Sequence, residues 1–90
     1  SYERVKMMIE RNMDKYGWEF LFLGANIDAA KEAARFGIRA ERAANYHADS
    51  TGTAVIYEAV SEAVYNVRAG RPMSKDWKKN IDEDYLKRGK

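Results

Sequence analysis

The chain contains no cysteine, only one proline and one histidine, and no long apolar segment. Without cysteine the protein has no disulfide framework, thiolate zinc site or cysteine nucleophile, and it suits a reducing compartment, so we expect the cytoplasm. The longest apolar run covers residues 20–23 and continues into Gly24 and Ala25. Because a membrane-spanning helix needs ~20 apolar residues, we expect no membrane segment.

The chain also lacks a large excess of positive or negative charge. Residues 1–74 hold ten basic and ten acidic side chains, residues 75–90 hold six and four, and the formal net charge is +2. A nucleic-acid-binding domain usually carries a strong, clustered basic field. We therefore expect no nucleic-acid partner.

The 90 residues suffice for one small domain, and 46% hydrophobic with 33% charged residues is typical of a globular chain. Apolar residues at three- and four-residue spacing predict a helix over residues 2–16, capped by Ser1 and ended by Gly17. Residues 18–23, WEFLFL, predict a strand covered on both faces. Asn26 or Asp28 then caps a helix over residues 27–36.

Residues 43–47 predict a second, shorter strand near an edge. Residues 49–51, all capping types, precede a helix over residues 53–68 whose expected buried stripe comprises Ile56, Val60, Ala63, Val64 and Val67. The tail, residues 74–88, places three apolar side chains on one face of a last helix. This stripe either packs on the body of the protein or docks on a partner: Trp77, Ile81 and Tyr85.

The order helix, strand, helix, strand, helix is typical of an α/β fold, to which the tail adds a last helix. The length of the connection between the two strands implies that they are parallel. Two parallel strands leave an unpaired edge that readily pairs with another chain. We therefore expect a homodimer through this exposed strand edge.

Ligands of open α/β sheets bind at the loops that follow the strands. One interpretation is an anion- or nucleotide-binding site there, built from backbone amides and hydroxyls. The other is that the same residues are ordinary helix caps and a tight turn, because no glycine-rich phosphate motif is present. The loop residues concerned are Gly24, Asn26, Asp28, Asp49, Ser50, Thr51 and Thr53.

No catalytic arrangement forms around His47, the only histidine. The spacing of Asp49, Thr51 and Thr53 suits a hard cation such as magnesium but lacks the remaining ligands. We expect no metal, no cofactor and no catalytic residue.

The stretches WEFLFLGANIDA and YEAVSEAV resemble the carboxyl-terminal part of bacterial and phage von Willebrand factor type A-like proteins, and the likeness covers residues 1–70. It implies a Rossmann-like, three-layered half-domain in which residues 18–23 form the penultimate strand and residues 43–47 the last. That family's Asp-x-Ser-x-Ser metal motif follows its first strand and would precede Ser1, so the resemblance transfers no metal ligand.

The resemblance also implies a function. We expect residues 1–70 to be the carboxyl-terminal portion of such a domain, followed by a charged amphipathic tail over residues 71–90. The expected function is a non-enzymatic protein-interaction module that lacks the metal-site motif. The alternative is a small anion- or nucleotide-binding α/β module that uses the two loops.

Overall fold

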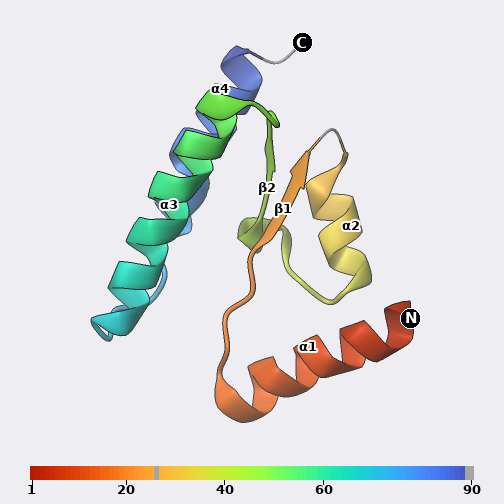
Figure 1. The fold of residues 1–90 in the computed structure, drawn as a ribbon. Coiled ribbons are helices and arrows are strands. Elements are labelled where there is room, and N and C mark those ends of the chain that lie inside the picture. The colour runs from red at the N-terminus through yellow and green to blue at the C-terminus, as the bar shows by residue number, and fades with distance from the viewer. Residues whose placement is uncertain (26, 89–90) are drawn as a thin grey trace. The chain divides into compact units, whose positions relative to one another are not determined.

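A computed structural model describes residues 1–25 and 27–88. Its two strands are parallel neighbours in one sheet, which confirms the predicted α/β order of helix, strand, helix, strand and helix with a carboxyl-terminal helix. The elements are α1 (Tyr2–Tyr16), β1 (Phe22–Ala25), α2 (Ala29–Arg35), a 3-10 turn η1 (Ala40–Arg42), β2 (Ala43–Tyr46), α3 (Ser50–Arg68), a second 3-10 turn η2 (Lys75–Lys78) and α4 (Lys79–Lys87). Figure 1 labels the α-helices and the strands.

The chain divides into two compact units, Ser1–Ala44 and Asn45–Lys90. The first contains α1, β1, α2 and η1, and the second contains α3, η2 and α4; β2 crosses the boundary. In the described part of the chain, no helix is both long and apolar enough to traverse a lipid bilayer.

Helix α1 has the bounds that the sequence predicts. The Ser1 side chain accepts a hydrogen bond from the Arg4 amide, which satisfies one of the unpaired amides of the first turn. Gly17 ends the helix in the left-handed conformation, with φ 68°, and its amide donates to the carbonyls of the last turn. Both predicted caps are confirmed.

The core of the first unit is a small apolar cluster built around Ile9, Ala29, Ala33, Ile38 and Ala43. The alanines let α2 lie close to β1, and half-buried aromatic and methionine side chains fill the surrounding space: Met13, Phe20, Phe22 and Phe36.

Tyr2 ties the start of α1 to α2. Its hydroxyl donates to Glu32 Oε1 over 3.1 Å, its ring centre lies 4.8 Å from that of Phe36, and the Arg35 guanidinium lies 3.9 Å above the ring. This combination of a hydrogen bond, an aromatic contact and a cation–π contact orients the first turn of α1 on the unit.

The first strand and the second helix begin later than predicted. β1 starts at Phe22 rather than at Trp18, which is exposed, and it extends through Gly24 to Ala25. Its partner β2 is only four residues long, so the paired stretch is four residues long on both sides. α2 begins at Ala29 because Asp28 is its cap.

The second unit is a pair of packed helical segments. η2 and α4 lie against α3, where small Ala59 and Ala63 are buried, and they contribute the buried side chains of Trp77 and Ile81. α3 begins at Ser50 rather than at Thr53, because Asp49 caps it.

The predicted buried stripe of α3 is partly wrong. Ala63 is buried, Ile56 and Val60 are half-buried, and Val64 and Val67 are exposed. The short segment that packs on α3 covers the alanine side of the helix, so the valines nearest its carboxyl end remain open to solvent.

Candidate functional site

The sequence predicts Gly24, Asn26 and Asp28 for the loop after the first strand. Gly24 is a buried strand residue, and a Cβ there would lie 2.7 Å from Ile27 Cγ1 and 3.2 Å from Ala29 Cβ. Asp28 caps α2 and accepts a hydrogen bond from the Lys31 amide over 3.1 Å. Asn26 lies outside the described residues. At this loop, Asp28 is therefore a helix cap and Gly24 permits a close approach.

The loop after β2 leads into the first turn of α3. Asp49 accepts from the Gly52 amide over 2.7 Å, and its carboxylate also binds Arg88, whose Nη1 and Nη2 lie 2.7 Å and 3.1 Å from Oδ2 and Oδ1. Ser50, Thr51 and Thr53 are exposed residues of this first turn. The acidic cap of α3 thus already pairs with a cation from the tail.

Arg88 joins two carboxylates. It also contacts Asp84, with Nε 3.0 Å from Oδ1 and Nη2 2.8 Å from Oδ2. Hydrogen bonds from Arg88, and then from the Gly52 amide, lower the pKa of Asp49 to about 2. The hydrogen bond from Arg88 likewise lowers the pKa of Asp84, and both carboxylates raise the pKa of Arg88. Arg88, Asp49 and Asp84 thus form a cluster of paired charges within the second unit, which we call the Arg88 clasp.

His47 packs against the tail rather than entering a catalytic arrangement. Its ring stacks on that of Tyr85 at 4.8 Å, and Nε2 lies 3.2 Å from the Tyr85 carbonyl oxygen. Throughout residues 1–25 and 27–88, no group of three or more His, Asp or Glu side chains is arranged to hold a metal ion. The carboxylate of Asp49, whose spacing with Thr51 and Thr53 suits a hard cation, pairs with Arg88 instead.

The three residues considered as a docking stripe pack within the second unit. Ile81 is 1% exposed, Trp77 is buried, and Tyr85 is half-buried against His47. This is the self-packing alternative of the two that the sequence leaves open.

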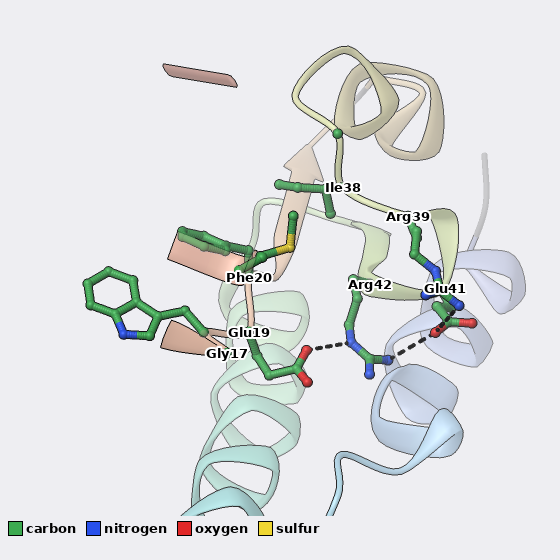
Figure 2. Close-up of a pocket in the computed structure, with 10 residues that line it drawn as sticks. Gly17, Glu19, Phe20, Ile38, Arg39, Glu41 and Arg42 are labelled. Carbon is green, nitrogen blue, oxygen red and sulfur yellow. Dashed lines mark hydrogen bonds and ion pairs between the residues drawn. The ribbon is translucent and has the colours of Figure 1, made fainter. Parts of the chain in front are cut away.

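A cavity of about 270 Å³ lies in the first unit, between the end of α1, the segment before β1 and η1. Figure 2 shows the Arg42 side chain between Glu19 and Glu41, with Phe20 and Ile38 also lining the cavity. Arg42 Nε lies 3.1 Å from Glu19 Oε1, and Arg42 Nη1 lies 3.7 Å from Glu41 Oε2.

Arg39 Nη2 lies 3.2 Å from the same Glu41 oxygen, so every charged side chain of this lining is in an ion pair with another. Arg42 Nη1 is buried and has no hydrogen-bond acceptor among the described residues. The cavity is smaller than the ~300 Å³ at which small-molecule sites usually begin. The ion pair between Arg42 and Glu19 instead joins η1 to the segment before β1.

The outer face of α1 is apolar, basic and open. Met7 is 67% exposed and Met8 54% exposed, and they line a groove of about 580 Å³ together with Arg4, Arg11, Asn12 and Tyr16. Exposed methionines are flexible and polarizable and are common at adaptable binding surfaces. The groove therefore combines exposed methionine side chains with two arginines.

Comparison of the chain with family models, with curated proteins and with solved structures finds no match. Sequence reasoning missed the α1 groove, the Arg42 ion pairs and the role of Arg88. The spacing of Asp84 and Arg88, one helical turn apart, is a signal for half of the Arg88 clasp. The contact of Arg88 with Asp49, 39 residues away, has no local signal.

Proposed function

We propose that the chain is a non-enzymatic protein-interaction module that forms a homodimer through its exposed strand edge. One observation carries this proposal: in the described part of the chain, β1 and β2 have only each other as strand neighbours. A two-stranded sheet is marginally stable, and a free edge is a template for another strand. Pairing of two copies extends the sheet to four strands.

The proposal includes descent from a von Willebrand factor type A-like domain, of which the chain is a fragment or truncated relative. The likeness of WEFLFLGANIDA to the end of such domains supports it, as does the parallel strand pair with its intervening helix. The cysteine-free composition supports a cytoplasmic location.

A non-enzymatic role is supported by what the two loops contain. Asp28 and Asp49 are both engaged as helix caps, and the lowered pKa of Asp49 has its main source in Arg88. Among the described residues of these loops, the two aspartates hold backbone amides of Lys31 and Gly52 rather than the nucleophile that covalent catalysis requires. Among the described residues, no specific observation favours the alternative of an anion- or nucleotide-binding module.

Analytical ultracentrifugation at tens of micromolar tests the strand-edge dimer. We expect a dimer for the natural sequence and a monomer for Leu21→Lys, because a lysine immediately before β1 opposes pairing along that edge. The matched control is Leu86→Lys, since Leu86 is exposed on α4, and it should remain dimeric. A monomeric natural sequence, or a dimer that Leu21→Lys leaves intact, contradicts the proposed edge.

A further inference from the structure

Two exposed helix faces carry complementary chemistry. The first, which we call the methionine face, lies on α1 and consists of Arg4, Met7, Met8 and Arg11. Both arginines are exposed, and neither has a carboxylate partner among the described residues. The face therefore combines two exposed methionines with two unpaired cations.

The second face lies on α3 in the other unit. The tyrosine face consists of Tyr57, Glu58, Glu62 and Tyr65, with the two rings 73% and 65% exposed. Glu58, Glu62 and Tyr65 follow one another at four- and three-residue spacing and share one side of α3, and Tyr57 adjoins that side. Neither Glu58 nor Glu62 has an ion-pair partner within residues 1–25 and 27–88.

We propose that the methionine face of one copy binds the tyrosine face of a second copy. Methionine sulfur and tyrosine rings attract each other, arginine stacks on tyrosine, and the unpaired arginines match the unpaired glutamates. The faces also match in length, since the rise of an α-helix gives ~10 Å from Arg4 to Arg11 and ~12 Å from Tyr57 to Tyr65.

This inference rests on the proposed function as an interaction module, but it uses a surface distinct from the strand edge. The contact joins unlike patches, so it is heterologous and can extend an edge-paired dimer into a larger assembly. A single helix-to-helix contact buries little surface, so we expect weak, transient binding that is detected at millimolar rather than micromolar concentration.

Charge reversal in the Leu21→Lys background tests this contact apart from the strand edge. The measurement is the concentration dependence of amide NMR chemical shifts up to millimolar protein. We expect shifts in α1 and α3 that grow with concentration. Arg4→Glu/Arg11→Glu should weaken this association about tenfold, because two exposed ion pairs are replaced by like-charge repulsion. Glu58→Arg/Glu62→Arg should have the same effect.

Mixing the two double variants is the decisive step. Each retains the face that the other has reversed, so a mixture should restore the association that is weakened in each variant alone. The control is Lys31→Glu/Lys79→Glu, which makes the same change of net charge as Arg4→Glu/Arg11→Glu at exposed sites elsewhere and should associate like the background. Shifts independent of concentration, unchanged association of either double variant, or no restoration on mixing would each overturn the contact.

Discussion

The two units of the chain are stabilised in different ways. Ser1–Ala44 has an apolar cluster to which two helices, residues of both strands and connecting segments contribute small and aromatic side chains. Asn45–Lys90 buries two large side chains, Trp77 and Ile81, against the alanine side of α3 and closes the end of α4 with charges around Arg88. The first unit therefore depends on many small contacts between side chains, and the second unit depends on two large buried side chains.

This difference indicates which kind of substitution destabilises each unit most. In the first unit the most buried residues are alanines, so removal of side-chain atoms costs little there and added volume costs more. In the second unit the buried volume is concentrated in single side chains, so truncation is the more damaging change. The following variants exploit that contrast.

The largest effect should come from Trp77→Ala. Removal of a buried tryptophan typically costs about 3–5 kcal/mol. Because α3 and the tail share few other buried side chains, we expect the second unit to lose its packing while the first unit stays folded. Amide NMR distinguishes loss of packing in the second unit alone from unfolding of both units. Trp18, the remaining tryptophan, reports on the first unit by fluorescence.

Leu86→Ala is the matched control for this truncation. Leu86 lies on α4 but is exposed, so the change should alter the free energy of unfolding by less than about 0.5 kcal/mol. If Trp77→Ala also removed the dispersed amide signals of residues 1–44, the two units would unfold as one, and the contrast drawn between them would be wrong.

A smaller effect is expected from Ala33→Leu in the first unit. Ala33 is 0% exposed, so a leucine there overpacks the interface of α2 with β1 at a cost of about 1–3 kcal/mol. Ala34→Leu adds the same atoms to the next residue, which is exposed, and should leave stability nearly unchanged. Urea denaturation compares the two, and equal stabilities would mean that the cluster is loosely packed.

Local signals in the sequence predicted most of the fold. Ser1 and Gly17 bound α1 correctly because capping depends only on neighbouring residues. β1 was placed four residues early because aromatic composition marks strand propensity, whereas pairing with the short β2 decides which residues join the sheet. Val64 and Val67 were predicted as buried because periodicity shows which face is apolar but not how far a partner covers it.

The candidate surfaces were less predictable. Met8 is one of the periodic apolar residues that predict the helix over residues 2–16, yet it lies in the exposed groove beside Arg11. Sequence spacing cannot distinguish a core side from an open side when both carry apolar residues. The clasp of Asp49 and Arg88 was missed for another reason: it joins a cap to a tail residue, and only the packing of α4 on α3 brings them together.

The smallest effect should come from acid acting on that clasp. Asp49 has an ordinary pKa of 3.8, which applies to the unfolded chain, and a folded value of about 2. A carboxylate whose pKa is lowered by folding contributes stability that is fully present above the unfolded value and is lost as pH falls through the folded one. The second unit should therefore lose this contribution between pH 4 and pH 2, whereas the apolar cluster of the first unit has no such dependence.

Arg88→Met isolates the clasp, because methionine keeps an unbranched side chain and removes the charge. We expect the carbon-13 titration of the Asp49 carboxyl to move from about 2 back toward 3.8, and the difference in thermal midpoint between variant and natural sequence to shrink as the pH falls from 4 through 2. Arg71→Met is the control, since Arg71 donates to the Asn66 amide oxygen rather than to a carboxylate. A stability difference for Arg88→Met that persists unchanged at pH 2 would show that Arg88 acts through packing and not through its charge.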